Sequence, residues 1–490
     1  ARHIVPIDPW KIRNRLKSKG VFDPGCYNRH FPNYGEEQMS TRVEKYSNLI
    51  KLETAQNVSS ASQAKTAQRV TALHAFYHEP DQMQIWASKV KGYVLDHLAD
   101  LLVQFETQCI QNGIIVHWAE DAKEANDIIL GLCKQGAGTT IVKAKSMATE
   151  EIHLNKHLEK NGFQPIETDL GEFVVQIDDD VPTHIVTPII HKNRGEISKS
   201  FLRENLGPET TVPEELAAQA REHLRSKFRA AQIGISGVNF GIAETGRIVL
   251  VENEGNSRLS TTAVDTHIAV MGIEKLLPIE QDLATFLPLL AGSATGQRIT
   301  TYTHFISGPR QPGETDGPTE VHVVLLDNGR SKILAGDYRD ILKCIRCGAC
   351  LNVCPVYRQV GGHGYAHVYS GPLGAVLAPG LEGVKAYGDL AKASSLCGAC
   401  EEVCPVRIPI PRMLLQLRDE TFRAGANTDH IPWRIFAMGA TKPFIWKSGL
   451  MMVPMAPFVP HPLAAAWKSS RDLPTNEQAS FRKWWSKSHK

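Results

Sequence analysis

The sequence predicts an α/β domain that follows an N-terminal helical region and precedes a cysteine-rich, metal-binding module. The α/β prediction rests on short apolar runs that alternate with helical segments between residues 136 and 335. The metal prediction rests on the cysteines, because seven of the ten lie between Cys344 and Cys404. The 490 residues also exceed what one hydrophobic core usually serves, so we expect more than one domain.

The regions outside the α/β domain differ from it in composition. Residues 1–40 are rich in proline, glycine and aromatic residues, which predicts an extended arm. Residues 41–135 carry apolar side chains at three-to-four spacing, which predicts helices. Residues 336–425 hold the clustered cysteines and end in a predicted helix, Arg412–Ala424. Residues 426–490 form a C-terminal tail that is rich in tryptophan and proline.

The α/β domain, taken as residues 136–335, has a local signal for each of its elements. Apolar runs predict strands at Thr140–Val142, Phe173–Ile177, Arg247–Glu252, His267–Met271 and Glu320–Leu326. A run of helix formers predicts a helix at Pro213–Ala231. Thr149 is a good N-cap that precedes two acids, so a helix is expected to begin there. The run Asp327-Asn328-Gly329 predicts a hairpin turn.

Composition and charge exclude several classes of protein. The net charge of +2 gives no reason to expect a nucleic-acid partner. The uncharged stretch Gly449–Trp467 approaches the length of a membrane span, but its four prolines would leave backbone groups unsatisfied in lipid. We therefore expect no transmembrane span, and peripheral membrane contact stays open. The absence of an apolar signal core before Trp10 and the clustered thiols predict a cytoplasmic location, with membrane association through partners as the alternative.

Two cysteine runs carry the functional prediction. The first, Cys344 to Pro355, has the spacing C-x2-C-x2-C-x3-C-P, which is the bacterial ferredoxin pattern. The second, Cys397 to Pro405, repeats this spacing without its first cysteine, where Ser394 stands. In paired runs of this kind the last cysteine ligates the other cluster. The predicted ligands are Cys344, Cys347, Cys350 and Cys404 for cluster one, and Cys354, Cys397 and Cys400 for cluster two.

This pattern leaves one corner of cluster two unassigned. Ser394, a distant cysteine, a partner residue or a solvent oxygen could fill the corner, or the centre is a [3Fe–4S] cluster. Structural zinc is the alternative for the whole region, because zinc also binds paired C-x2-C motifs. Four cysteines packed as in the first run fit zinc poorly, since zinc sites typically draw two ligands from each motif. Two [4Fe–4S]-type clusters are therefore the preferred interpretation.

Further motifs extend along most of the chain. They are Lys143–Glu151, Glu167–Glu172, Gly241–Gly246, Val251–Asn256, Leu325–Arg330, Cys344–Tyr357, Gly361–Tyr365 and Tyr369–Gly374. Together they resemble the lactate-utilization iron–sulfur protein B family (LutB, also called LldF). The resemblance implies a LUD domain with a sugar-isomerase/CoA-transferase-like α/β fold, followed by an α-helical, ferredoxin-like module with two [4Fe–4S] clusters. It also implies a complex that oxidises L-lactate to pyruvate with a cysteine-rich subunit and a second LUD-domain subunit.

Catalytic residues are weakly indicated. Glu244 belongs to a Glu-x-Gly turn of the kind that can border the active cleft in the resembled fold. His184 or His191 could take the hydroxyl proton of a 2-hydroxy acid, although a hydrogen-bonded structural histidine is the commoner case. Candidates for anchoring a carboxylate, against a default of solvated surface charge, are Lys143, Lys145 and Arg194.

The predicted function is electron transfer within an L-lactate-oxidising complex. The chain has no flavin or nicotinamide fingerprint, and two-electron oxidation usually belongs to a cofactor. The alternative is that this chain itself oxidises lactate, with the open iron corner of cluster two as a Lewis acid. A redox or iron sensor is disfavoured, because no helix-turn-helix or basic stripe is evident. The tryptophans of the tail, mixed with Lys and Arg, suit a partner surface better than a membrane interface.

Overall fold

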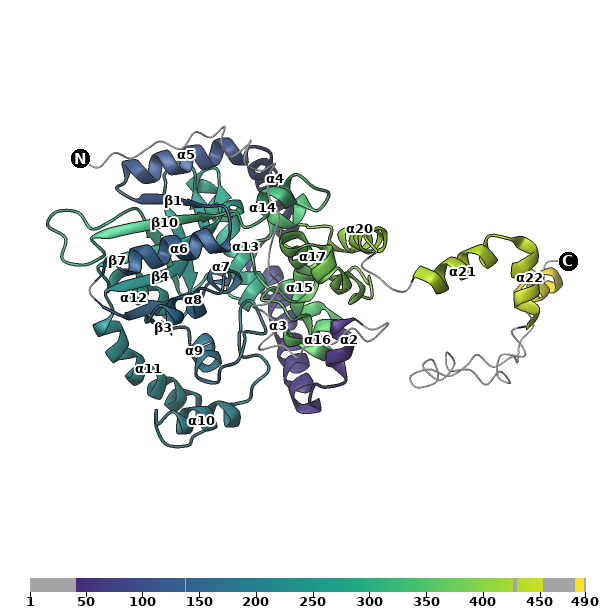
Figure 1. Ribbon diagram of the computed structural model, residues 1–490, viewed down its shortest axis with the longest axis horizontal. Helices are drawn as coiled ribbons and strands as arrows, with labels where there is room; N and C mark the ends of the chain where they lie inside the picture. The colour runs from purple at the N-terminus through teal and green to yellow at the C-terminus, as the bar shows by residue number, and fades with distance from the viewer. Residues whose placement is uncertain (1–40, 137, 426–429, 453–480, 489–490) are drawn as a thin grey trace. The chain divides into compact units, whose positions relative to one another are not determined.

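A six-stranded parallel sheet forms the centre of the α/β part (Figure 1). The computed structural model describes residues 41–136, 138–425, 430–452 and 481–488. In pairing order the strands are β1 (Ile115–Ala119), β10 (Glu320–Leu326), β7 (Thr266–Gly272), β4 (Ile233–Gly237), β2 (Thr140–Lys143) and β3 (Gln164–Glu167). The central strands β10, β7 and β4 are buried along nearly all their residues, as expected for a parallel sheet that is covered on both faces.

Alternating side chains along β10 divide the core between the two faces of this sheet. Val321, Val323 and Leu325 pack in one cluster with α4 and α5. Val324 and Leu326 pack in another cluster with α6 and α8, which lie on the same face of the sheet in Figure 1. These helices are α4 (Pro80–Asp96), α5 (Leu98–Gln111), α6 (Ala122–Cys133) and α8 (Leu154–Lys160).

A second, four-stranded sheet has the order β8-β5-β6-β9. Its strands are β8 (Leu276–Leu277), β5 (Phe240–Ile242), β6 (Ile248–Glu252) and β9 (Tyr302–Ile306). Strand β5 closely follows β4 in the chain, and β8 closely follows β7. The second sheet therefore extends from the C-terminal ends of the main strands, which is the edge where ligands bind in open α/β sheets.

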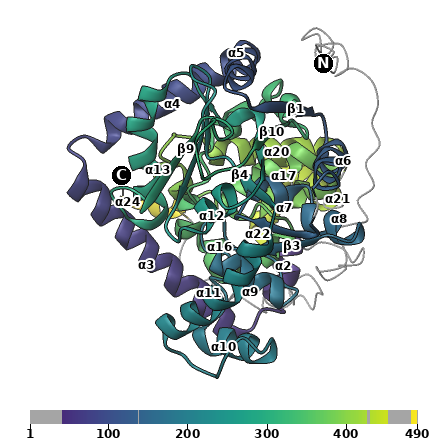
Figure 2. The same ribbon diagram turned by 90° about the vertical axis from the view of Figure 1, so that its left-hand side faces the viewer.

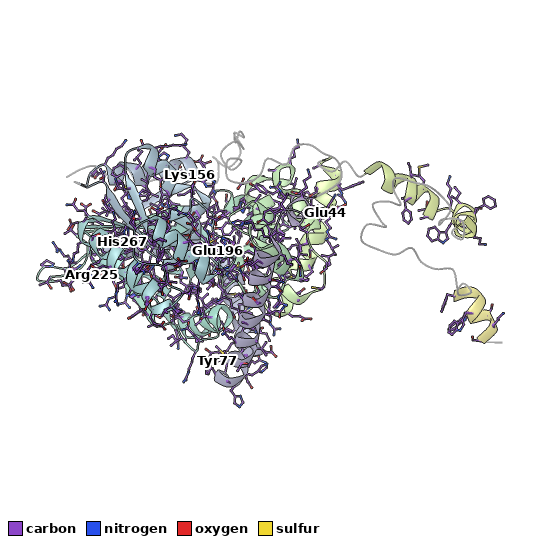
Figure 3. The ribbon with its side chains drawn as sticks, turned by 90° about the horizontal axis from the view of Figure 1, so that it is seen from below. Glu44, Tyr77, Lys156, Glu196, Arg225 and His267 are labelled. Carbon is purple, nitrogen blue, oxygen red and sulfur yellow. The ribbon has the colours of Figure 1, made fainter. Side chains whose placement is uncertain are left out.

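The histidines of the main sheet have structural partners. His267, labelled in Figure 3, is buried, and its Nε2 lies 2.8 Å from the hydroxyl of Ser236. Burial lowers the pKa of His267 to about 3, so its ring is neutral near pH 7. His117 and His322 face each other on neighbouring strands, with ring nitrogens 3.0 Å apart. We therefore assign these rings to the packing of the sheet.

The cysteine-rich region is built from short helices, and no strand occurs in it among the described residues. The helices are η4 (Arg339–Lys343), α15 (Ala349–Val353), α16 (Pro355–Val360), η5 (His363–Tyr365), α17 (Gly371–Glu382), α18 (Val384–Tyr387), η6 (Gly388–Lys392), α19 (Ala399–Glu402) and α20 (Ile410–Arg423). Their hydrophobic core is continuous with Ile185, Phe240 and Leu277 of the α/β part. The described residues up to Gly425 accordingly form one compact unit.

The N-terminal helices connect the two parts of this unit. The first of them are α2 (Arg42–Ser47) and α3 (Leu52–Phe76). Helix α3 packs against α15 and α16 of the cysteine-rich region, as Figure 1 shows, and also against α13 (Leu283–Thr295). Helix α13 also contacts α4 (Figure 2). The remaining helices of the unit are α7 (Met147–Glu151), α9 (Leu170–Ile177), α10 (Arg194–Arg203), α11 (Pro213–Ala230), α12 (Asn256–Thr262) and α14 (Arg330–Leu334), with the short η2 (Ile273–Lys275) and η3 (Glu280–Asp282).

Most predicted elements are confirmed, including four of the five strands and the helix at α11, but the predicted strand Phe173–Ile177 is wrong. These residues lie in α9, because the Asp169 carboxylate accepts a hydrogen bond from the Glu172 N–H and caps a helix there. A short apolar run has the same composition in a strand and in a buried helix, so the capping residue decides which of the two forms. The predicted cap at Thr149 is also wrong, since Ser146 accepts from the Thr149 N–H and starts α7.

Two further expectations differ from the structure for reasons of sheet pairing. The turn Asp327-Asn328-Gly329 does not form a hairpin but leads from β10 into α14. Strand β10 lies between two parallel partners, so the chain has to leave the sheet there. Strand β1 lies inside region 41–135, which was predicted to be helical, and the sheet therefore begins before residue 136. Its mixed sequence, Ile-Val-His-Trp-Ala, gives little strand signal at the edge of a sheet.

The described part of the C-terminal tail is helical. It consists of α21 (His430–Ala440), α22 (Pro443–Met452) and α24 (Phe481–Ser488). Phe436, Phe444, Trp446, Trp484 and Trp485 are exposed on these helices. Among the described residues, no helix combines the length and the apolar character that a membrane crossing requires. The predicted N-terminal arm and the four prolines of the stretch Gly449–Trp467 lie outside the described residues.

Candidate iron–sulfur site and adjacent cavity

The seven clustered cysteines lie in two loops, each of which runs into short helices. Cys344 and Cys347 precede α15, which holds Cys350, and Cys354 is the N-cap of α16. In the second loop Cys397 precedes α19, which holds Cys400, and Cys404 follows that helix. No disulfide joins the described cysteines. Cys397 is the exposed member of the set, while the other six are buried or half-buried.

Thiols of one run are electrostatic neighbours of thiols of the other run. Burial raises the pKa of Cys347 to about 12, and the neighbouring Cys344 and Cys404 raise it further. Cys404 is thus a neighbour of the first run, although it belongs to the second in sequence. Burial likewise raises the pKa of Cys400 to about 12, and Cys354 and Cys397 raise it further, with a smaller contribution from Cys404. This exchange of the last cysteines is what the ferredoxin pattern predicts.

The residues present fit iron–sulfur clusters. Three thiols receive backbone N–H groups, at 3.4 Å from Arg346 to Cys344, 3.5 Å from Tyr357 to Cys354 and 3.4 Å from Ile408 to Cys404. Hydrogen bonds of this kind stabilise the negative charge of cluster sulfurs. The apolar core of the module includes or packs against every one of these thiols except that of the exposed Cys397, which limits the access of water to them.

The second run repeats the backbone conformation of the first. Arg346, which precedes Cys347, and Leu396, which precedes Cys397, have positive φ values of 62° and 55°. In the first run the Arg346 N–H donates to the Cys344 sulfur, at 3.4 Å. In the second the Leu396 N–H donates to the Ser394 hydroxyl oxygen, at 3.1 Å. The hydroxyl of Ser394 therefore has the place that the sulfur of Cys344 has in the first run.

A cavity of about 340 Å³ lies where the main sheet meets the cysteine-rich region. The segments that follow β2, β4 and β7 form one side of it, through residues such as Lys145, Gly237 and Lys275. Arg346 and Tyr369 contribute from the cysteine-rich region. The cavity thus lies at the C-terminal edge of the sheet and next to the loop between Cys344 and Cys347. This is the place where a parallel sheet is expected to bind a ligand.

Two cations of the cavity lining have nitrogens that lack partners. The Arg346 side chain is only 7% exposed; its Nη2 donates to Glu274 at 3.2 Å, and its guanidinium lies 4.9 Å from the centre of the Tyr369 ring. Its Nη1 is buried and has no hydrogen-bond partner among the described residues. The buried Nζ of Lys145 also has no hydrogen-bond partner among the described residues. Burying a donor without a partner is unfavourable, so these atoms mark a place for an acceptor.

Acidic residues line another part of the cavity. Burial, with Asp169 nearby, raises the pKa of Glu254 to about 7. Glu252 is held by the ring of His304, at 2.6 Å, and by the N–H of Ser257, at 2.7 Å. One carboxylate oxygen of Glu254 accepts a hydrogen bond from the N–H of Leu170, at 3.1 Å. Glu254 is therefore the acid that is more open to a ligand.

A buried ion network joins the two sides of the cavity. Arg330, at the start of α14, donates to both oxygens of Glu151, at 2.8 and 2.7 Å, and to Glu274, at 2.7 Å. The Tyr369 hydroxyl also donates to Glu151, at 2.7 Å. Glu274 bonds Arg346 in turn, so the network connects the sheet to the cysteine loop.

The predicted candidates Glu244, His184 and His191 do not line the cavity. Glu244 is exposed at the turn after β5, where its carboxylate accepts from the Glu280 N–H. His184 accepts the N–H groups of Val186 and Thr187 at Nδ1, each at 3.0 Å, and its Nε2 lies 3.1 Å from the Asn352 amide oxygen. Burial lowers the pKa of His184 to about 3, so it holds the loops together as a neutral ring.

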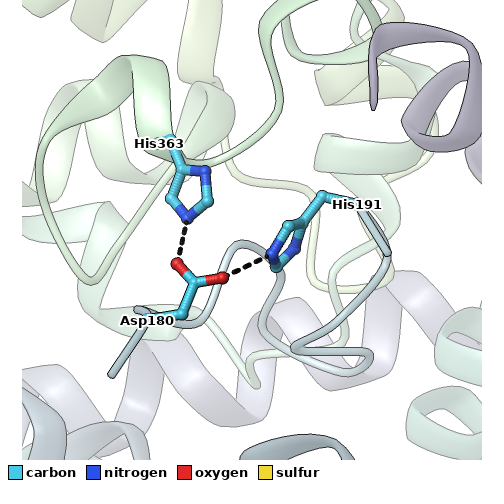
Figure 4. A group of neighbouring side chains, drawn as sticks. All are labelled: Asp180, His191 and His363. Atoms are coloured by element: carbon cyan, nitrogen blue, oxygen red, sulfur yellow. Dashed lines mark hydrogen bonds and ion pairs between the residues drawn. The ribbon is translucent and has the colours of Figure 1, made fainter. Parts of the chain in front are cut away.

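His191 belongs to a hydrogen-bonded group with Asp180 and His363 (Figure 4). The Asp180 carboxylate lies between the two rings, 2.9 Å from His191 and 3.1 Å from His363. Lys192 also pairs with Asp180, at 3.0 Å, so the charge of this carboxylate is already balanced. We assign the group to tying the loop after α9 to the segment that follows α16.

The three cations proposed from the sequence lie in different environments. Lys143 is buried in ion pairs with Glu167, at 2.5 Å, and Glu150, at 3.0 Å. Arg194 is exposed at the start of α10. Lys145 is the one that lines the cavity. Arg346 and Glu254 were not predicted from the sequence. The signal for Arg346 was a charged residue between two cluster cysteines.

Comparisons with known proteins agree with this site. Family models match residues 102–326 (LUD domain), 340–408 (4Fe-4S dicluster domain) and 418–490 (Lactate utilisation protein B, C-terminal). Lactate utilization protein B of Bacillus licheniformis is 43% identical over 442 residues, which cover 87% of this chain and 92% of that protein. The protein of the same name from Bacillus subtilis is 44% identical over 412 residues, covering 81% and 86%.

A further relative is named as an electron transport protein. The Uncharacterized electron transport protein YkgF of Escherichia coli is 44% identical over 415 residues, which cover 82% of this chain and 87% of that protein. The chain thus combines a LUD domain, which contains the parallel sheet, with an iron–sulfur dicluster domain. With these matches over most of its length, the chain belongs to the lactate utilization protein B family.

Proposed function

We propose that this chain carries two iron–sulfur clusters and relays electrons as a subunit of a complex that oxidises L-lactate to pyruvate. The observation that carries the proposal is that Cys404 neighbours Cys347 of the first run, while Cys354 of the first run neighbours Cys400 of the second. Cluster one takes Cys344, Cys347, Cys350 and Cys404. Cluster two takes Cys354, Cys397 and Cys400. The names of the relatives support the role in lactate utilization.

The exposure of Cys397 supports cluster two as the point where the relay exchanges electrons with a partner. Arg346, between two ligands of cluster one, lines the cavity, whereas Cys397 of cluster two is exposed. Electrons from lactate would enter or leave through the exposed cluster when a partner docks beside it. The partners are a cysteine-rich subunit and a second LUD-domain subunit. The location is cytoplasmic, with any membrane association made through these partners.

The finer fold assignment is part of the same proposal. A parallel sheet with ligand space at its C-terminal edge supports the sugar-isomerase/CoA-transferase-like α/β fold. Short helices without a strand among the described residues of 336–425 support an α-helical, ferredoxin-like module. Lactate oxidation at an open iron corner is not favoured. None of the three cysteines of cluster two, all of which the structure describes, lines the cavity.

The relay predicts that L-lactate reduces the clusters only in the presence of the partner subunits. Oxidation of lactate releases two electrons and each cluster accepts one, so both clusters should become reduced in the assembled complex. The measurement is electron paramagnetic resonance (EPR) of freeze-quenched samples, with dithionite as the positive control and pyruvate as the control that donates no electrons. Reduction of the isolated chain by lactate would point to a catalytic subunit instead. An unreduced complex would contradict the proposal.

We also propose that Ser394 supplies the fourth ligand of cluster two. The support is that its hydroxyl occupies the place of the Cys344 sulfur and accepts the equivalent N–H bond. The guanidinium of Arg418 donates to the Ser394 carbonyl at 2.8 Å, which holds this loop in position. A serine alkoxide, a distant cysteine or a solvent oxygen would each leave a different spectroscopic signature at the corner iron.

Replacement of Ser394 distinguishes these ligands. Ser394→Ala is expected to convert cluster two to a [3Fe–4S] form on oxidation, because the corner iron loses its protein ligand. Ser394→Cys is expected to retain four irons with an altered EPR spectrum. Ser395→Ala, which removes the hydroxyl beside Cys397, serves as the matched control and should keep the native iron content. A native spectrum of cluster two in Ser394→Ala would assign the corner to another ligand.

A further inference from the structure

We infer that the cavity at the C-terminal edge of the main sheet binds a small monocarboxylate with an adjacent hydroxyl or keto oxygen, held by Lys145 and Arg346. The choice of this ligand class rests on the proposed role in lactate oxidation, while the site itself rests on the geometry of the cavity. The volume of about 340 Å³ is ample for such a molecule and falls in the range of small-molecule sites.

Two cationic side chains of the cavity each leave one buried nitrogen free for an anionic ligand. The Nζ of Lys145 and the Nη1 of Arg346 are buried without acceptors, although both side chains line the cavity. A charged donor that is removed from water and left unpaired is strongly unfavourable. A carboxylate would accept from both donors through charge-assisted hydrogen bonds, which are about twice as strong as neutral ones. Among the described residues, neither nitrogen has a hydrogen-bond acceptor.

The acids of the cavity favour a ligand with a single negative charge. Asp169, Glu252 and Glu254 line the same space, and they would repel a phosphate or another polyanion. Val251 and Leu290 add an apolar surface between the charged groups. A ligand fits this arrangement when its carboxylate faces the cations and its hydroxyl faces Glu254. A 2-hydroxy or 2-oxo monocarboxylate carries both groups on neighbouring carbons.

Arg346 connects the cavity to cluster one. Its backbone N–H donates to the Cys344 sulfur, and its side chain lines the cavity. Hydrogen bonds to cluster sulfurs and nearby charge set the electronic properties of a cluster. Neutralisation of the Arg346 side chain by a bound carboxylate should therefore alter the EPR spectrum of reduced cluster one. The binding site thus has a readout that does not depend on turnover.

The test is the binding of L-lactate to the cluster-loaded chain, measured anaerobically by calorimetry and by the EPR spectrum of cluster one. Lys145→Gln is expected to weaken binding by about 10- to 100-fold, since it removes one charge-assisted hydrogen bond. Lys145→Arg keeps the charge and should restore most of the affinity. Lys134→Gln removes an exposed lysine of the same domain and is the matched control, with unchanged affinity.

The pH dependence of binding gives a second test. Glu254 is neutral below about pH 7 and ionised above it, because burial raises its pKa, and the groups around it are Asp169, Lys145 and Glu252. The ionised carboxylate repels the ligand, so affinity should fall as the pH rises through 7. Glu254→Gln should abolish this fall. An equal fall in Glu254→Gln would exclude Glu254 from the site.

The outcomes separate this inference from the proposed function. Absence of lactate and pyruvate binding to the wild type, or unchanged affinity in Lys145→Gln, would overturn the inference. If inorganic phosphate binds as tightly as lactate, the assignment of the ligand as a monocarboxylate is wrong. In each of these cases the clusters would still be reduced by lactate in the complex, and the relay would stand. A chain without iron and sulfide, or a complex that lactate does not reduce, would instead remove the relay.

Discussion

Replacing Cys404 with alanine is expected to remove cluster one and to leave cluster two in place. Cys404 belongs to the second run in sequence, but Cys344 and Cys347 are among its neighbours in the structure. A cubane that loses one of its four protein ligands is exposed to loss of iron. The mutant should therefore keep about half of the iron and sulfide of the wild type. Lactate-dependent electron flow through the complex should fall at least tenfold, because the relay then has a single centre.

The measurement combines iron and sulfide analysis with EPR of the two reduced clusters. Cys347→Ala should give the same result as Cys404→Ala, and Cys354→Ala should remove the other cluster. Cys133→Ala is the matched control, because Cys133 is a buried free thiol on α6 and in a different core cluster. Loss of the cluster-two signal in Cys404→Ala, with cluster one intact, would show that the ligands do not cross between the runs.

Arg330→Met is expected to lower the free energy of unfolding by about 3–5 kcal/mol. Arg330 is buried and donates to the carboxylates of Glu151 and Glu274, so its loss leaves two carboxylates without their main counter-charge. The size of the effect comes from this uncompensated charge rather than from the net stabilisation that the ion pairs contribute. Met fills a similar volume, which limits the contribution of a cavity.

The measurement is chemical denaturation of the cluster-loaded chain at neutral pH. The matched control is Arg423→Met, because Arg423 makes an exposed pair with Asp419 at 2.7 Å and should contribute about 0–1 kcal/mol. A loss in Arg330→Met no larger than that in the control would contradict the assignment of the network as the link between the sheet and the cysteine loop.

Acid should weaken the same network in the wild type. Burial opposes the ionisation of Glu274, but the guanidinium groups of Arg330 and Arg346 prevail and lower its pKa to about 2. A depressed pKa means that the folded state binds fewer protons than the unfolded state. The resulting stabilisation is complete above the ordinary glutamate pKa of about 4.3 and is lost as the pH falls toward 2. Arg330→Met should lose most of this dependence.

Local patterns were sufficient for the features that depend on neighbouring residues. The spacing of the cysteines predicts two ligand sets, because most ligands of a set lie within one run and the rule for the last cysteine is general; the assignment of the individual ligands stays a prediction. The apolar runs at β2, β6, β7 and β10 predicted strands, since a fully buried strand is apolar along its length. The run at Phe173–Ile177 failed for the converse reason: an apolar run is equally compatible with a buried helix, and the cap at Asp169 decided.

The cavity could be found only in the folded chain. Lys145, Glu254 and Arg346 are more than ninety residues apart in sequence, and the order of the strands brings their segments to one edge of the sheet. Strand order depends on how layers pack over the whole domain, which no local run of residues encodes. The same holds for the buried Arg330 network, whose acids come from α7 and η2. Whether a lysine is solvated or buried beside a cavity is a property of tertiary packing, because burial is decided by residues that are distant in the chain.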